Sequence, residues 1–442
     1  MPSLALSMIV RNAEKDIRAC LHSVLGTVDE IHIADTGSTD STIRIASEMG
    51  AQVISIPWEN DFAKARNAAL SEVHTDWVLF LDADEQLDPL ASQYLPGLMD
   101  QKLVTGYLTS IRNYVLSIRD RVWDRPAVPN DTSFEPAKEF PAFVEHQNVR
   151  LFRRSADVFF VGRVHETVGT SIERSGGILR PCPVLIHHFG LAADADTRAR
   201  KNLLYREMGR QKLQEMPENA QAHFELGLVE FDNFHQYEEA LRLFQRACAL
   251  NPNLSVSWFF AGMSHLQLGH AEKALECLKR AGTGPMVSEA KGDALYKSGQ
   301  FDQARRFYLR AFEGVRLLPD LESKIGLAEV RSGRVKSGVA RLRQALEHGP
   351  TEPQVYDRLV TALVWLDQIA EAAAVAERKA DIIKSDPQSY LRAAVIWAQQ
   401  ENWIRSAEIL HRALTQFPHH QALERVLAEV LPRTSDTQLR TN

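Results

Sequence analysis

Two carboxylates directly follow a short apolar run near residue 80. The run covers residues 77–81, and Asp82 and Asp84 come next, separated by one alanine. Side chains two positions apart lie on the same side of an extended chain, so we expect both carboxylates to face the same way. Hard divalent cations prefer oxygen ligands and often share them with a substrate diphosphate. The pair therefore predicts a Mn²⁺ or Mg²⁺ site that works on a phosphorylated substrate.

A second polar segment, DTGSTD at residues 35–40, follows another apolar run. Gly37 permits a tight backbone path, and Ser38 and Thr39 can cap a following helix. The carboxylate of Asp35 can accept hydrogen bonds from a base imide or a ribose hydroxyl, or it can serve only to close the turn.

Arg66 is the third candidate. It lies on a segment with helical periodicity, residues 63–73, whose apolar positions turn inward. A guanidinium near a diphosphate can bind it bidentately. A surface arginine is the simpler interpretation, and only the neighbouring motifs favour a ligand role.

Strand-like and helix-like segments alternate through the first hundred residues and would position these side chains. The alternation is typical of βαβ units around a parallel sheet. Open α/β sheets bind ligands outside the carboxyl ends of their strands, where Asp35 and the Asp82/Asp84 pair fall. The predicted helices cover 13–25, a segment ending near residue 50, and 63–73; the predicted strands cover 4–10, 30–34, 52–56 and 77–81.

The pattern changes between residues 106 and 188. The polar, proline-bearing stretch 120–141 is either a functional flap or partly disordered. A short basic cluster, Arg150, Arg153 and Arg154, predicts a solvated or phosphate-facing edge. Further strands are predicted at 106–111, 149–152 and 184–187.

After residue 198 the sequence is helical almost to its end, and it repeats with a period near 34 residues. Alanines follow the repeated glycines at matching offsets, and prolines close several units. Small residues where two helices cross, repeated at this period, are what a helix-turn-helix solenoid needs. The pattern resembles the tetratricopeptide repeat, with five or six units over residues 219–418, and implies a concave face for peptides or partner proteins. The glycines are Gly227, Gly262, Gly292 and Gly326.

The bulk composition excludes several classes of protein. A formal net charge of -6 gives no basis for nucleic-acid binding, which calls for a basic face. Four scattered cysteines argue against a zinc site and a disulfide framework. We expect no transmembrane segment, no signal peptide and a cytoplasmic location, because no apolar run is long enough.

Five segments together resemble family-2 glycosyltransferases of the GT-A type. The resemblance covers the chain up to about residue 90 and extends weakly to about residue 190. It implies inverting transfer of a sugar from a nucleotide donor, usually uridine-linked, with a divalent metal. One departure is Ala13, where the family usually has glutamate. The segments, in order and with matching spacing, are MIVRNAE (8–14), VDEI (28–31), DTGSTD (35–40), FAKARN (62–67) and LDADE (81–85).

Carried over residue by residue, the resemblance assigns roles to the first candidates. It implies that Asp35 contacts the nucleoside and that Arg66 contacts the uracil or the diphosphate. Asp82 would hold the ribose or the metal, and Asp84 would ligate the metal. Related enzymes often have a metal-binding histidine at the end of the last strand, where His188 is the better match; a core or capping histidine is the alternative.

Inverting transfer also needs a general base for the acceptor hydroxyl. RLFR at 150–153 and GRVHE at 162–166 resemble an arrangement in a subgroup of these enzymes that also carries tetratricopeptide repeats, with peptide- and lipopolysaccharide-core-modifying members. We assign Glu166 as the base and His165 as its positioning or acceptor-contacting partner. A structural His-Glu pair that closes a hairpin is the alternative, and the rival bases are Glu135, Glu139 and Glu145.

We therefore predict an α/β GT-A-like domain at residues 1–195, a helical linker at 196–218 and an all-α tetratricopeptide-like solenoid at 219–430. The expected activity is metal-dependent transfer of a sugar from a nucleotide-sugar donor to a hydroxyl or thiol of a protein or peptide recruited by the repeats. An envelope polysaccharide or lipid-linked glycan is the alternative acceptor. The repeats could equally bind a partner protein or another copy of the chain.

Other classes fit less well. A nucleotidyltransferase usually has a glycine-rich basic loop after its first strand, and a dinucleotide-binding oxidoreductase needs G-x-G-x-x-G; both are missing here. A repeat scaffold with a degenerate sugar-nucleotide sensor is the non-catalytic alternative. The intact Arg66, Asp82 and Asp84 argue against such degeneracy.

Overall fold

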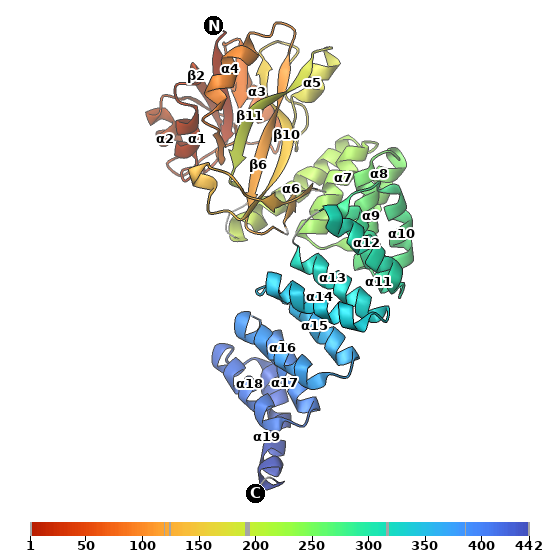
Figure 1. The fold of residues 1–442 in the computed structure, drawn as a ribbon. Helices are drawn as coiled ribbons and strands as arrows, with labels where there is room; N and C mark the ends of the chain where they lie inside the picture. The colour runs from red at the N-terminus through yellow and green to blue at the C-terminus, as the bar shows by residue number, and fades with distance from the viewer. Residues whose placement is uncertain are drawn as a thin grey trace. The chain divides into compact units, whose positions relative to one another are not determined.

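The computed structural model describes residues 2–118, 120–122, 125–190, 195–314, 318–384 and 386–440. The chain divides into two compact units, Met1–Pro252 and Asn253–Asn442. The first unit holds a central sheet, the helices that cover it and the first helices that follow it (Figure 1). The described residues of the second unit fold into helices and their connections.

A nine-stranded sheet lies at the centre of the first unit, in the order β3-β2-β1-β4-β10-β6-β11-β5, with β9 beside β10. The first four strands pair in parallel, as the strand–helix alternation predicts. β10 then runs antiparallel to both β4 and β6, so the whole sheet is mixed. The strands are β1 (Leu4–Val10), β2 (Glu30–Asp35), β3 (Gln52–Ser55), β4 (Trp77–Phe80), β5 (Glu85–Leu87), β6 (Gly106–Val115), β9 (Val128–Pro129), β10 (Ala142–Arg153) and β11 (Leu179–His188).

Five helices of this unit pack against the sheet. On α1, the buried residues Ile17, Cys20, Leu21 and Val24 recur at the spacing of one helix face. β1 pairs in parallel with both β2 and β4, so the carboxyl ends of the three strands lie at the same edge of the sheet. These helices are α1 (Ile17–Val24), α2 (Thr42–Glu48), α3 (Phe62–Ser71), α4 (Ala91–Met99) and α5 (Gly169–Arg174); α6 (Ala195–Glu215) follows them and packs against the next helix of the unit.

The stretch 120–141 contains short elements in its described residues. β7 (Arg121–Val122) pairs with β8 (Arg125–Pro126), and β9 adds to the edge of β10. A single 3-10 turn, η1 (Glu135–Ala137), precedes β10. In the described residues of this stretch, β9 therefore extends the central sheet, while β7 and β8 form a separate two-stranded sheet.

The predicted basic edge at residues 150–154 is wrong for two of its three arginines. Arg150 is only 7% exposed. Arg153 donates to the carbonyl oxygens of Met99, Gln101 and Val104. The reason is that β10 is an interior strand between β4 and β6, so its inward side chains meet the core instead of solvent.

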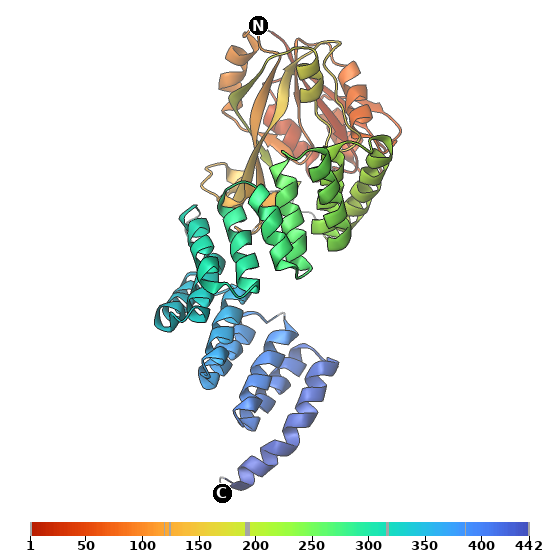
Figure 2. The same cartoon turned by 90° about the vertical axis from the view of Figure 1, so that its right-hand side faces the viewer.

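Helix pairs follow the sheet, and the described residues form six of them (Figure 2). The repeated glycines lie where the helices of a pair cross: a Cβ at Gly227 would collide with the Phe244 ring, and one at Gly292 with the Tyr308 ring. The pairs are α7 (Ala220–Leu228) with α8 (Tyr237–Leu250), α9 (Ser255–Gln267) with α10 (Ala271–Arg280), α11 (Pro285–Lys297) with α12 (Phe301–Gly314), α13 (Pro319–Arg331) with α14 (Val335–His348), α15 (Pro353–Trp365) with α16 (Ile369–Ile382), and α17 (Pro387–Gln399) with α18 (Trp403–Gln416); α19 (Gln421–Arg440) follows, and η3 (Val229–Asn233) extends α7.

Two of the four predicted prolines lie where expected: Pro252 and Pro350 stand in the turns that follow α8 and α14. Pro285 and Pro319 occupy the first positions of α11 and α13 rather than closing the preceding units. A proline suits the first helical turn because the N–H that it lacks has no intrahelical partner there. Within the described residues, no helix is long and apolar enough to cross a membrane.

Candidate active site

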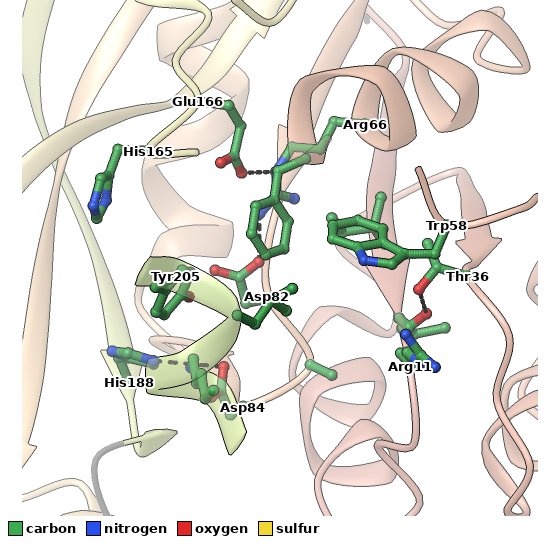
Figure 3. A pocket seen from close by; sticks show the side chains of 16 residues that line it. Arg11, Thr36, Trp58, Arg66, Asp82, Asp84, His165, Glu166, His188 and Tyr205 are labelled. Carbon is green, nitrogen blue, oxygen red and sulfur yellow. Dashed lines mark hydrogen bonds and ion pairs between the residues drawn. The ribbon is translucent and has the colours of Figure 1, made fainter. Parts of the chain in front are cut away.

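A cavity of about 440 Å³ opens in the first unit at the carboxyl ends of β1, β2 and β4 (Figure 3). Six of the seven predicted site residues line it, and Asp35 does not. The lining residues are Ile9, Val10, Arg11, Thr36, Trp58, Phe62, Arg66, Asp82, Ala83, Asp84, His165, Glu166, His188, Lys201, Leu204 and Tyr205.

The chain does not stay extended through the Asp82/Asp84 pair. A turn follows β4, closed by a hydrogen bond from the Glu85 N–H to the Asp82 carbonyl at 3.0 Å. Asp82 is directed toward Arg66 and Asp84 toward His188 (Figure 3). The prediction that both carboxylates face the same way in an extended chain is therefore wrong, although both line one cavity.

Asp82 is held by guanidinium groups on two sides. Arg66 donates from Nη2 to Asp82 Oδ1 at 2.5 Å and from Nε to Glu166 Oε1 at 2.6 Å. Arg150 Nη2 lies 3.6 Å from Asp82 Oδ2 and donates to Glu85 Oε1 at 2.7 Å. Glu85 also accepts the backbone N–H of Asp82 at 2.8 Å. These five side chains form the inner cluster: Arg66, Asp82, Glu85, Arg150 and Glu166.

Burial and charge together set the protonation of the inner cluster. Burial alone would raise the pKa of Asp82, but the charges of Arg66 and Arg150 outweigh it and hold that pKa well below its usual range. Burial raises the pKa of Glu85 to about 7. Both guanidinium groups also lie over the Phe80 ring, 4.8 and 4.3 Å from its centroid. Arg66 is thus paired with two protein carboxylates, and its contact with uracil or diphosphate stays a prediction.

Asp84 and His188 face each other on the wall of the cavity opposite the inner cluster. His188 Nε2 lies 3.5 Å from Asp84 Oδ1, while His188 Nδ1 is 2.7 Å from Asn113 Oδ1. β11 lies beside β6, which brings His188 opposite Asn113. Burial lowers the pKa of His188, but the hydrogen bond and charge of Asp84 outweigh it, so the net pKa is raised. The neighbouring His187 is fully buried and bonds Tyr114, so it serves the core.

The residues on this wall fit a divalent cation. A Cβ at Gly190 would collide with both Asp84 and His188, so this glycine leaves open the space beside them. The Asn113 amide oxygen orients His188 through its Nδ1, as partners of metal-binding histidines do. Among the described residues, no group of three or more His, Cys, Asp or Glu could hold a metal alone. Mg²⁺ commonly takes one or two protein ligands and fills its other positions with substrate phosphate and water.

His165 and Glu166 lie on a tight loop at the mouth of the cavity. Val161 and Thr167 close the loop by exchanging backbone hydrogen bonds at 3.0 Å, and His165 has a positive φ of 53°. The His165 ring stacks on Tyr205, with 6.2 Å between centroids. Backbone bonds of Val161 and Thr167 thus close the loop, and the side chains of His165 and Glu166 both line the cavity. The rival bases are not among the described lining residues: Glu135, Glu139 and Glu145.

Asp35 closes its own turn. Its carboxylate accepts the backbone N–H groups of Gly37 and Ser38 at 3.0 Å, and the residue is only 2% exposed. The adjacent Thr36 reaches the cavity instead, together with Trp58 from the loop after β3. A contact between Asp35 and a nucleoside stays a prediction.

Helix α6 supplies a wall that the motifs did not indicate. Lys201, Leu204 and Tyr205 line the cavity at the i, i+3, i+4 spacing of one helix face. Sequence reasoning treated this helix as a linker because it carries no recognisable motif. Trp58 was missed for the same reason, since a lone aromatic residue in a loop gives no pattern.

Comparison with known proteins agrees with this architecture. Residues 6–159 match the family described as glycosyl transferase family 2. Residues 206–255 and 256–281 match families described as tetratricopeptide repeat. The sequence-based expectations of a glycosyltransferase-like α/β domain and of a repeat solenoid are both confirmed.

Three curated proteins illustrate the similarity. The chain is 32% identical over 201 residues to a TPR repeat-containing protein of Synechococcus elongatus, covering 44% of each protein. It is 28% identical over 183 residues to an uncharacterized glycosyltransferase of Rickettsia typhi, covering 40% of this chain and 61% of that protein. It is 35% identical over 85 residues to the SPbeta prophage-derived glycosyltransferase SunS of Bacillus subtilis, covering 19% and 20%. The chain spans about half the length of the first two relatives.

Proposed function

We propose that this chain, a family-2 glycosyltransferase by its N-terminal domain with tetratricopeptide repeats after it, transfers a sugar from a uridine-diphosphate-linked donor to a hydroxyl or thiol of a protein or peptide. The observation that carries the proposal is the arrangement of the cavity. Trp58 and Thr36 line one side, Asp84 and His188 the other, and Asp82 lies between them (Figure 3).

This arrangement suits a nucleotide sugar laid across the cavity. The Trp58 ring offers a stacking face for a base at one end. Asp84 and His188 would hold a Mn²⁺ or Mg²⁺ ion at the other end. The bound metal would neutralise charge on the diphosphate. Asp82, fixed by Arg66 and Arg150, is positioned for the ribose hydroxyls or the metal between these ends.

Glu166 is the proposed base. The acceptor's O–H or S–H proton passes to the Glu166 carboxylate, and the acceptor atom bonds to the anomeric carbon from the face opposite the diphosphate. The bond from that carbon to the diphosphate oxygen breaks, and the nucleoside diphosphate leaves with the electron pair. His165, stacked on Tyr205, would contact the acceptor.

The proposed recruitment of a protein acceptor rests on the repeats. In the second unit, aromatic rings and cations line a cavity of about 240 Å³, which suits a peptide segment. Its lining residues are Met263, Leu266, Gln267, Asp293, Tyr296, Lys297, Tyr308, Lys324, Leu327 and Arg358.

The transfer is tested by incubating the full chain with radiolabelled nucleotide sugars, Mn²⁺ and an extract of the source cells. We expect label in the protein fraction, abolished by chelation and by Glu166→Gln. Label in the lipid or polysaccharide fraction would instead favour the envelope-glycan acceptor. No transfer from any donor would contradict the proposal.

The recruitment is tested separately by blocking the repeat cavity. Gln267 is exposed at its rim, so Gln267→Trp should reduce protein labelling without altering donor binding. Gln303→Trp, an equally exposed position on α12 away from the lining, is the matched control. Equal labelling by both variants would contradict recruitment through this cavity.

A further inference from the structure

Helix α6 projects one charged side chain into the donor cavity. Lys201 lies on the same helix face as Leu204 and Tyr205 and shares the cavity with Asp82 and Asp84. Its ammonium group is 5.8 Å from the centroid of the Tyr205 ring. Lys201 is exposed, and Tyr205, followed by the charges of Asp84 and Asp82, raises its pKa. Lys201 therefore carries a full positive charge at neutral pH.

The other cations of the cavity have different placements. Arg66 pairs with the carboxylates of Asp82 and Glu166, and His188 faces Asp84. Arg11 lies beside Thr36 and Trp58, away from Asp84 (Figure 3). Among the described residues, no carboxylate forms an ion pair with Lys201. Lys201 is therefore the cavity cation that stands near Asp84 without a carboxylate partner of its own in the described chain.

The position of Lys201 is supported because α6 is anchored at its other end. Lys212 donates to the Val164 carbonyl at 3.1 Å and pairs with Glu225 of α7 at 2.7 Å. Arg163 pairs with Glu215 at 2.6 Å. The contacts with Val164 and Arg163 hold α6 against the loop that carries His165 and Glu166. One helix thus contributes to the donor cavity and fixes the loop of the proposed base.

We infer that Lys201 binds the diphosphate of the nucleotide donor and stabilises the nucleoside diphosphate as it leaves, an assignment that rests on the proposed function. The diphosphate gains negative charge as its bond to the sugar breaks, and a cation fixed at that point stabilises the transition state more than the bound donor. The inference makes α6 part of the active site rather than a linker to the repeats.

The test is titration calorimetry of the full chain with UDP and with UMP, both with Mn²⁺. Lys201→Met keeps the aliphatic stem and removes the charge, and it should weaken UDP binding by about 10- to 100-fold, the effect of losing a charge-assisted hydrogen bond. UMP binding should change by less than about threefold, because UMP lacks the second phosphate. Lys201→Arg should retain most of the UDP affinity.

Arg210→Met is the matched control, since Arg210 lies on the same helix, outside the cavity lining and half-exposed. It should bind UDP as the wild type does, and thermal melting checks that each variant is folded. UDP binding by Lys201→Met within about twofold of the wild type would overturn the assignment alone. Absence of UDP binding by the wild type would overturn the proposed donor together with the assignment.

Discussion

Two neighbouring regions of the same cavity are built in opposite ways. In the inner cluster, every charged side chain has a protein partner of opposite charge: Arg66, Asp82, Glu85, Arg150 and Glu166. The outer wall, formed by Asp84, His188 and Lys201, holds only a loose 3.5 Å contact between Asp84 and His188 and a lysine without a described carboxylate partner. The side chain is 1% exposed for Glu85, 37% for Asp82 and 28% for Asp84, so ion pairing rather than burial distinguishes the two regions.

The difference assigns different tasks to neighbouring carboxylates of the segment LDADE at residues 81–85. Asp82 and Glu85 belong to the inner cluster, and Asp84 belongs to the outer wall. Charges that the protein itself neutralises can fix geometry, but they have little capacity left for a ligand. Charges left facing a cavity gain their partners when a ligand arrives. We therefore assign the inner cluster mainly to holding Asp82 and Glu166 in place, and the outer wall to metal and diphosphate.

The largest expected effect is on stability, from the inner cluster. Glu85→Ala would leave the buried guanidinium of Arg150 with only its longer 3.6 Å contact to Asp82, and Arg150 Nε and Nη1 already lack hydrogen-bond partners. Removing one partner of a buried ion pair typically costs about 3 kcal/mol or more. Urea denaturation should show this loss. The adjacent Asp84→Ala is the control and should change the free energy of unfolding by less than about 1 kcal/mol. An equal loss of unfolding free energy in both variants would contradict the difference between the two regions.

A smaller effect should come from the support of the outer wall. Asn113→Ala removes the oxygen that orients His188 through Nδ1. Loss of such a support typically weakens metal binding by about 10- to 100-fold. Calorimetry with Mn²⁺ and UDP measures the change. Asn113→Asp restores an acceptor oxygen and should recover much of the affinity, and an unaltered affinity in Asn113→Ala would count against His188 as a ligand.

The smallest expected effect lies outside the cavity altogether. Gly292→Ala would push a methyl group into the Tyr308 ring where α11 crosses α12. The net cost should be about 1 kcal/mol, because alanine's higher helix propensity offsets part of the overpacking. Gly97→Ala on α4, where nothing lies within 4 Å, is the control and should not destabilise the protein. Donor affinity should be unchanged in both variants, and a weakened affinity in Gly292→Ala would link the repeats to the donor site.

Sequence reasoning found the parts of the site that depend on local pattern. The run of residues 77–81 followed by Asp82 and Asp84 identifies a strand end, and the helical periodicity around Arg66 places it on a helix beside that edge. The GRVHE segment led to Glu166, which the structure joins to Arg66 across 100 positions of the chain.

The missed residues depend on long-range packing. The sequence predicts Arg150 as part of a basic edge, whereas the strand order places β10 inside the sheet and Arg150 in its interior. Lys201 lies on a helix of ordinary composition, and only the packing of α6 beside the carboxyl ends of the strands brings it to the cavity. The turn that separates Asp82 from Asp84 is closed by a hydrogen bond from the Glu85 N–H to the Asp82 carbonyl, which no spacing rule indicates.

We propose that the outer wall binds a nucleotide donor through a metal held by Asp84. The most direct measurement is calorimetric titration of a panel of nucleotide sugars into the wild type and Asp84→Asn, each with Mn²⁺ and with a chelator. We predict metal-dependent binding of one donor by the wild type, lost in Asp84→Asn while the variant stays folded. Equal binding by both proteins with the chelator present would contradict it.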